Sequence, residues 1–274
     1  TATLTPVNED TVAPTGASVS ALFGSSTNFN DVDGNTLAGV AITANAAGST
    51  QGTWQWQANG TSTWTNIATS GLSDATAFYL AANTTLRFLP ALNFNGTPGA
   101  LTARLVDSSA SGLTNGTNIN VSTNGGTTAY SSATVSLGTS ITAVNDAPVR
   151  TAGTLTAIAV NEDSATTTAA SLGLSGLTYG PGGGTAEAGQ TLTYKITVVP
   201  GFMTLWKADG TAVLANSTLT GAELQGLHYK TVADANGSGS ISWSVTDSGS
   251  GTSPNVNTIS ESLSVSVAAM NDAP

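Results

Sequence analysis

Short runs of alternating apolar and polar residues recur along the chain, separated by stretches rich in Gly, Asn, Ser and Thr. Such runs are typical of half-buried strands, because successive side chains of a strand face opposite sides of its sheet. The clearest runs lie at residues 37–42, 53–57, 86–89, 100–106 and 133–137. Asn59 and Gly60, which precede Trp64, are typical of a tight hairpin turn. Only residues 219–227 predict a helical turn, so we expect an all-β fold.

Several short phrases occur twice in the same order. The sequence AVNDAP at 143–148 returns as AMNDAP at 269–274, VNEDT at 7–11 returns as VNEDS at 160–164, NGT at 95–97 returns as NGS at 236–238, and LVDS at 105–108 returns as VTDS at 245–248. Because proline cannot donate to a strand ladder, each NDAP phrase predicts the exit from a last strand into a linker. The repeats predict two tandem Greek-key β-sandwich domains of the cadherin or immunoglobulin type, at residues 1–146 and 147–274.

The first predicted domain is longer than the second in two places. One is the tryptophan-containing hairpin, and the other is the Gly-, Ser- and Asn-rich segment at 108–132. We expect both to be excursions on the surface, which a sandwich tolerates.

Composition excludes several classes of function. The chain has 274 residues, a net charge of −10 and no cysteine, so it offers neither a basic stripe for nucleic acid nor thiol chemistry. With 39% hydrophobic residues in regular patterns it is expected to fold. No apolar run approaches the length of a membrane span, so we expect no membrane insertion. The first residues lack the features of a signal peptide, and we expect any export signal to lie outside this sequence.

The repeated phrases resemble those of tandem cadherin-like, Ig-like extender repeats in giant bacterial surface proteins, including RTX-type adhesins exported by type I secretion. The resemblance covers nearly the whole chain. It is carried by the two NED phrases, DVDG at 31–34, NFNGT at 93–97, the acidic strand ends at 107 and 247, and both NDAP exits. It implies calcium at the domain junctions and a role as a spacer that holds a distal binding module away from the cell.

Most acidic residues fall within these phrases, and calcium is bound by carboxylate, amide and carbonyl oxygens of the kind they supply. An EF-hand loop is excluded, since the sixth position counted from Asp31 is Thr36 and the twelfth is Ile42. The competing interpretation is that these Asp and Asn residues simply form turns and solvate the surface.

A cadherin-like topology implies how the candidate ligands sort. The upper end of the first domain would hold Asp31, Asp33 and Asp107; the junction would hold Glu9, Asn145, Asp146, Glu187 and Asp247; and a terminal half-site would hold Glu162, Asn271 and Asp272. In the second domain Ala186 and Ala188 stand where the first domain has aspartates, which leaves that upper site with fewer carboxylates.

The aromatic residues allow two interpretations. Trp54 and Trp56 face one side of a strand and Trp64 follows them, so the row could stack sugars or fill a core of otherwise small residues. Trp206 and Trp243 are predicted to be core residues. His228 is the single histidine of the chain and lacks the partners that a zinc or catalytic site would need.

From these features we expect a calcium-stiffened extender segment of a large bacterial adhesin, exported to the cell surface, that performs no catalysis. Its cofactor is expected to be Ca²⁺ and its partners the neighbouring repeats of the same chain. The alternative is a ligand-binding module that recognises a glycan or peptide through the tryptophan-containing insertion of the first domain.

Overall fold

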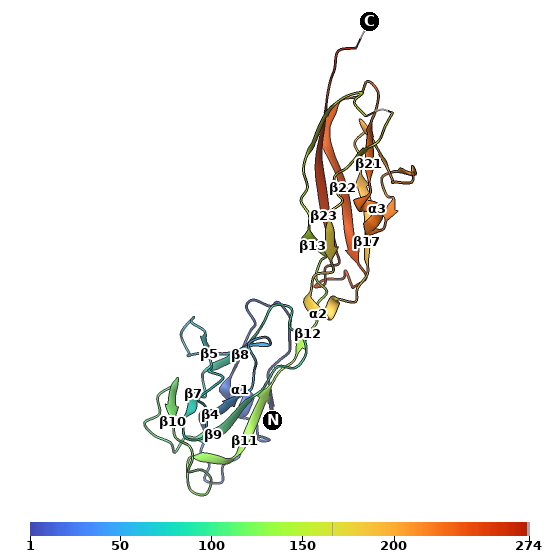
Figure 1. The fold of residues 1–274 in the computed structure, drawn as a ribbon. Coiled ribbons are helices and arrows are strands. Elements are labelled where there is room, and N and C mark those ends of the chain that lie inside the picture. The colour runs from blue at the N-terminus through green and yellow to red at the C-terminus, as the bar shows by residue number, and fades with distance from the viewer. Residues whose placement is uncertain (166, 273–274) are drawn as a thin grey trace. The chain divides into compact units, whose positions relative to one another are not determined.

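The computed structural model describes residues 1–165 and 167–272 and divides into two compact units, Thr1–Ala143 (unit 1) and Val144–Pro274 (unit 2). The predicted fold class is confirmed: strands dominate both units, and in the described part of the chain only three short helices accompany them (Figure 1). The domain boundary expected after Asp146 stays a prediction.

Unit 1 is a sandwich of two sheets. The larger sheet has the order β1 (Ala2–Thr3), β11 (Tyr130–Gly138), β9 (Leu101–Asp107), β4 (Leu37–Asn45), β7 (Ala77–Ala81) and β10 (Thr117–Ile119). The smaller sheet has the order β3 (Ala17–Ser18), β8 (Thr85–Pro90), β5 (Gly52–Gln57) and β6 (Thr65–Asn66). A separate parallel pair joins β12 (Ile141–Thr142) to β2 (Val7–Asn8). From β4 to β9 the chain passes repeatedly from one sheet to the other, so residues distant in sequence share one core.

The core of unit 1 follows the predicted alternation. On β5 and β8 the inward side chains include Trp54, Leu86 and Phe88, each no more than 1% exposed. Helix α1 (Val19–Phe23) begins where the side chain of Ser18 accepts a hydrogen bond from the Ala21 N–H over 3.1 Å, which satisfies one free donor of the first turn. Capping at this point places one face of the helix in the core.

The segment at 108–132 differs from the expected surface excursion. It contributes β10 to the larger sheet, and it buries Val121 completely against the outer face of that sheet. Ala41, Tyr79 and Val106 complete this second, smaller core. The sequence gives little sign of it because a single buried valine within a polar stretch has no periodicity. Strand β4 is therefore buried on both faces.

The tryptophan hairpin forms, but its turn is not the tight one expected. Strands β5 and β6 pair through Gln55 with Asn66 and through Trp56 with Thr65, so a loop of residues 58–64 connects them. Within it the Thr61 N–H donates to the Ala58 carbonyl over 3.1 Å, around Asn59 and Gly60. The Asn–Gly pair thus makes a local turn inside a longer loop.

Unit 2 is a second sandwich. One sheet has the order β14 (Ile158–Asn161), β23 (Thr258–Ala268), β22 (Gly237–Asp247), β17 (Leu192–Val198) and β20 (Thr218–Leu219), and the other has the order β15 (Ala170–Ser171), β21 (His228–Thr231), β18 (Met203–Trp206) and β19 (Ala212–Val213). A short pair joins β13 (Val149–Ala152) to β16 (Thr178–Gly180). The long β22–β23 hairpin is drawn in orange and red in Figure 1.

The core of unit 2 confirms one tryptophan prediction and corrects another. Trp243 is fully buried and its indole N–H donates to the Tyr179 hydroxyl over 3.1 Å. Trp206 is only half-buried, because it lies on the outer face of β18 at the end of the strand. The predicted helical turn is α3 (Gly221–Gln225), which begins at a capping box between Thr220 and Glu223. No helix of the described residues is long and apolar enough to cross a membrane.

Candidate functional site

Four predicted ligands from distant parts of unit 2 come together where that unit begins. We call Asn145, Asp146, Glu187 and Asp247 the entry cluster. Asn145 and Asp146 precede β13, Glu187 is the last residue of helix α2 (Gly184–Glu187), and Asp247 is the last residue of β22. The fifth residue expected at the junction, Glu9, belongs to unit 1.

Asn145 is held by a set of directional hydrogen bonds. Its backbone N–H donates to Asn255 Oδ1 over 2.7 Å, and its side-chain Nδ2 donates to Asp247 Oδ1 over 3.1 Å. Its Oδ1 accepts a hydrogen bond from Gln190 Nε2 over 2.6 Å. Gly249 is required beside it, because a Cβ there would overlap the Asn145 amide. The asparagine therefore anchors the first residues of unit 2 to the end of β22.

Glu187 is bound through both of its carboxylate oxygens. Oε1 accepts from the Asp146 N–H and Oε2 from the Gly183 N–H, each over 2.9 Å. A Cβ added at Gly183 would lie 2.8 Å from Asp146 Oδ2 and 2.7 Å from Glu187 Oε2. Because Gly183 has no side chain, the carboxylates of Asp146 and Glu187 can approach the backbone at this point.

The buried charges of the entry cluster are incompletely compensated. Glu187 is 6% exposed and Asp247 is 4% exposed, and in the described part of the chain neither forms an ion pair. Asp247 Oδ1 accepts from the Gly249 N–H over 2.8 Å as well as from Asn145, whereas Oδ2 is covered and has no hydrogen-bond partner among the described residues. Buried carboxylates are normally paired or bound to a metal. The oxygen-only donor set fits a hard cation such as Ca²⁺.

A second group lies where the described part of unit 2 ends. We call Glu162, Asp163, Asp234 and Asp272 the exit cluster. Carboxylate oxygens of the three aspartates lie within 4.8 Å of one another, and all three residues are exposed. Partial desolvation and the charges of Asp163, Asp234 and Glu162 raise the pKa of the Asp272 carboxyl above its ordinary value. The structure thus brings the predicted Glu162 and Asp272 together with two acids that were not predicted as ligands.

Asp163 and Asp234 carried signals that the sequence interpretation did not use. Asp163 follows Glu162 within the repeated NED phrase, and Asp234 precedes the repeated Asn236–Gly237 phrase by two positions. Both adopt a positive φ, 61° and 56°, a conformation that Asp tolerates better than most residues. The third predicted member, Asn271, is exposed and donates its side-chain amide to the Asp272 carbonyl over 3.3 Å.

The glutamate of each NED phrase occupies the same environment in both units. Glu162 is 5% exposed and accepts from the Met270 N–H over 2.6 Å and from Asn236 Nδ2 over 3.4 Å. Glu9 is also 5% exposed and accepts from Asn95 Nδ2 over 3.1 Å. The NED and Asn–Gly phrases therefore recur together because they meet in space within each sandwich.

The predicted upper site of unit 1 is less complete. Asp31 and Asp107 line a common pocket of about 320 Å³, but Asp33 is exposed and does not line it. Asp31 Oδ1 accepts from the N–H groups of Asp33 and Asn35 over 2.9 and 3.0 Å, and Asp107 Oδ1 accepts from the Ser109 N–H over 2.7 Å. These are the local side-chain-to-backbone bonds of Asx turns. The turn interpretation accounts for both residues as they stand.

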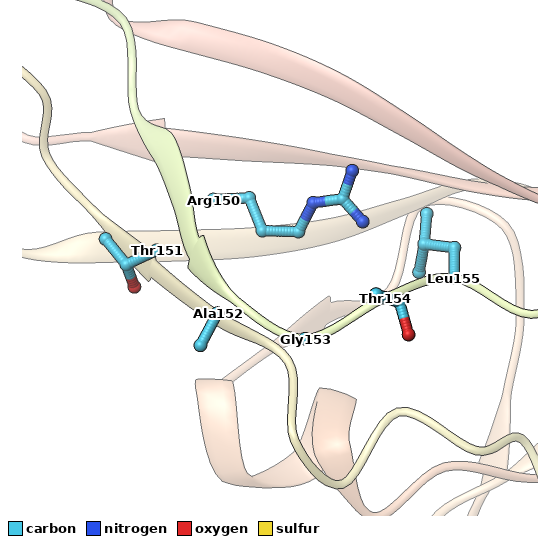
Figure 2. Close-up of a pocket in the computed structure, with 6 residues that line it drawn as sticks. All are labelled: Arg150, Thr151, Ala152, Gly153, Thr154 and Leu155. Atoms are coloured by element: carbon cyan, nitrogen blue, oxygen red, sulfur yellow. The ribbon is translucent and has the colours of Figure 1, made fainter.

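Other hollows in unit 2 offer less chemistry. One of about 440 Å³ follows the end of β13, and the residues lining it are drawn in Figure 2: Arg150, Thr151, Ala152, Gly153, Thr154 and Leu155. Its single charged side chain, Arg150, lies 3.5 Å from Glu261 in an ion pair. His228 directs Nδ1 at the Gly226 carbonyl over 2.8 Å, and half-buried Trp206 lies beside it. Neither place gathers acidic residues.

Comparison with known proteins gives likeness in fold at low identity. No family model matches the chain, and no curated protein matches it. Similar solved structures include human CDH23 EC21-23, with 12% identity and a TM-score of 0.37 over 98% of this chain and 72% of that one. Mouse protocadherin-24 EC1-3 has 12% identity and a TM-score of 0.35, over 98% of this chain and 69% of that one. The CupB6 tip adhesin from Pseudomonas aeruginosa has 10% identity and a TM-score of 0.29, over 85% of this chain and 86% of that one.

Proposed function

We propose that this chain is a calcium-stiffened extender segment of a large bacterial surface adhesin, exported to the cell exterior, whose partners are neighbouring repeats of the same chain. The observation that carries the proposal is the entry cluster. There, two buried carboxylates without a described ion pair, Glu187 and Asp247, lie beside Asn145 and Asp146. One carboxylate oxygen, Asp247 Oδ2, is covered and unpaired among the described residues.

Calcium is the cation that suits these clusters best. The side chains offer carboxylate and amide oxygens, which hard cations bind, and the chain has no cysteine. Its one histidine, His228, belongs to neither cluster. Mg²⁺ requires near-ideal octahedral geometry and gives up its waters reluctantly, whereas Ca²⁺ accepts irregular sets of six to eight oxygens. The oxygen ligands of the entry cluster come from a linker, a short helix and the end of a strand, and such an irregular set suits Ca²⁺ better than Mg²⁺.

The proposed mechanical effect follows from where the two clusters lie along the chain. The entry cluster includes the first residues of unit 2, and the exit cluster includes Asp272 near its end. Carboxylates of like charge repel one another, and a bound divalent cation reverses that repulsion. Calcium would then fasten the segments through which the chain enters and leaves the sandwich. Linkers held in this way transmit force and keep their direction, and free ones act as hinges.

The test is thermal unfolding of the whole chain in calcium and in chelator. A ligand that binds only the folded state raises stability by RT ln(1 + [L]/Kd), so Tm should rise with calcium concentration. Replacing Asp146 with alanine should weaken the rise, whereas Asp209→Asn should leave it intact, because Asp209 is fully exposed and outside both clusters. A Tm that is the same in millimolar calcium and in chelator would contradict the proposal and would mean that the acidic residues of these phrases only form turns.

A further inference from the structure

A pocket of about 360 Å³ opens in unit 1 between the edges of its two sheets. Strand β6 forms one border and β10 the other, and both are edge strands. Trp56 lies opposite Thr65 in the β5–β6 pair, and Phe78 lies opposite Asn118 in the β7–β10 pair. The pocket is therefore the side opening of the sandwich, and its volume falls within the range of small-molecule sites.

The floor of this pocket is aromatic. The rings of Trp56 and Phe78 meet edge to face, with centroids 5.7 Å apart and planes inclined at 66°. Both are half-buried and pack against the core, and Leu72 completes the apolar lining. Gly116, at φ +79°, makes room for the indole, because a Cβ there would lie 2.5 Å from the Trp56 ring. The chain thus keeps a large apolar ring at an open edge.

The rim of the pocket is polar and uncharged. Asn66 uses Oδ1 to accept a hydrogen bond from Gln55 Nε2 over 2.8 Å, which leaves its own Nδ2 available. The Asn118 side chain, also exposed, makes no hydrogen bond to the described residues. Thr65 adds a hydroxyl group, and none of the described lining residues is charged. These groups can donate to and accept from hydroxyls without being able to neutralise an ion.

The indole of Trp56 has an unmet requirement. Its Nε1 is covered from solvent and has no hydrogen-bond acceptor among the described residues. By contrast, fully buried Trp54 donates its indole N–H to the Gly99 carbonyl over 2.8 Å. Buried donors are normally paired, and an unpaired one is costly. A small rotation of the Trp56 ring that brought Nε1 to a ligand oxygen would therefore gain a hydrogen bond without breaking one.

We propose that this pocket binds a neutral sugar residue of a glycan. The apolar face of a sugar ring would pack against the Trp56 and Phe78 floor, while its hydroxyls bond to the amides of Asn66 and Asn118. The absence of charged groups from the described lining selects against uronic or sialic acids. This activity goes beyond the proposed extender role and is independent of it, because the pocket lies in unit 1 and shares no residue with the entry or exit cluster.

The experiment follows the five tryptophan indole N–H signals of the ¹⁵N-labelled full chain by NMR. The probes are the methyl glycosides of glucose, galactose and mannose, and N-acetylglucosamine, each at millimolar concentration, with glucuronate as the charged comparison. Trp56→Phe assigns the Trp56 signal by its loss. We expect at least one neutral probe to shift that signal saturably and glucuronate to leave it in place.

Two matched variants separate binding from folding. Asn118→Ala removes an exposed rim amide and should weaken binding of the responsive probe about fivefold, the effect of one typical hydrogen bond. Asn83→Ala removes another exposed asparagine that does not line the pocket and should leave the affinity unchanged. The proposal is overturned if no neutral probe moves the Trp56 signal, or if the two variants weaken binding equally. A response to glucuronate alone would also overturn it.

Discussion

Asn145 donates its side-chain amide to Asp247 over 3.1 Å, although 102 residues separate them in the chain. The bond joins the segment that opens unit 2 to the last residue of β22. It leaves Asp247 with one oxygen that accepts two hydrogen bonds and another that, among the described residues, accepts none. An anion buried in this way is stabilised most effectively by a cation, so Asp247 provides the sharpest test of the proposed site.

Replacing Asp247 with asparagine should abolish most of the calcium-dependent stabilisation that arises at the entry cluster. One saturated site contributes about 2.7 kcal/mol at a free calcium concentration of about 100 Kd. In chelator the substitution removes a buried, half-paired charge, so we expect the variant's Tm to equal or exceed that of the original chain. Thermal unfolding in calcium and in chelator measures both effects.

The control for this substitution is Asp209→Asn, at a fully exposed position where the carboxylate accepts from the Thr211 N–H over 2.8 Å. The Asp209→Asn variant should show the same rise in Tm with calcium as the original chain. If Asp247→Asn keeps the full increment, or if both variants lose it equally, Asp247 does not bind the cation.

The exit cluster predicts a titration that responds to calcium. Partial desolvation and the charges of Asp163, Asp234 and Glu162 raise the pKa of Asp272, because they disfavour its charged form. Between the ordinary and the raised pKa the folded state holds more protons than the unfolded one, so this group lowers stability as pH rises through that window. Calcium favours the carboxylate and should lower the pKa of Asp272. Carboxyl-carbon NMR with and without calcium measures the change.

A variant sharpens the titration experiment. Asp234→Asn removes one neighbouring charge and should lower the pKa of Asp272 in chelator without any cation. If the pKa of Asp272 is unaffected by calcium and by this substitution alike, the three aspartates do not act as one electrostatic site.

Tyr179→Phe should destabilise unit 2 by about 1–3 kcal/mol, because the fully buried Trp243 loses the acceptor for its indole N–H. Burial raises the pKa of Tyr179 from 10.0 to about 12. Between these values the unfolded chain loses this proton first, so stability falls as pH rises, and the variant should lack that part of the alkaline loss. Urea unfolding at neutral and alkaline pH measures both effects.

Tyr130→Phe is the matched control at neutral pH, since the Tyr130 hydroxyl makes no hydrogen bond to the described residues. It should change stability little. Equal losses in the two variants would mean that the Trp243–Tyr179 bond contributes nothing specific.

Much of the fold was predictable because strand periodicity is local. The run at 86–89 became part of β8, where buried and less buried residues alternate, and the run at 133–137 became part of β11, where they alternate from Thr134 onward. The small core around Val121 was not predictable, because its partners Ala41 and Tyr79 lie on strands whose other face already fills the main core. Burial on both faces removes the alternation that marks a strand.

The sequence predicted which kinds of residue form the candidate sites better than it predicted which particular residues meet there. Repeated phrases pointed to Glu162 and Asp247, because phrases that recur in the same order occupy equivalent positions in the two sandwiches. Asp163 and Asp234 were missed as members of the exit cluster, since a single Asp at a turn looks the same in sequence whether or not other acids face it. Asp33 was predicted as a ligand and is exposed away from the pocket that Asp31 lines. Which turn residues meet is decided by tertiary structure.

The central claim, that calcium stiffens the chain, is tested most directly by small-angle X-ray scattering of the full chain in millimolar calcium and in chelator. If cations fasten the entry segment, calcium should narrow the distribution of interatomic distances and make the scattering that of a more rigid particle. Asp146→Ala should reduce this change. Identical scattering curves in calcium and in chelator would contradict the account.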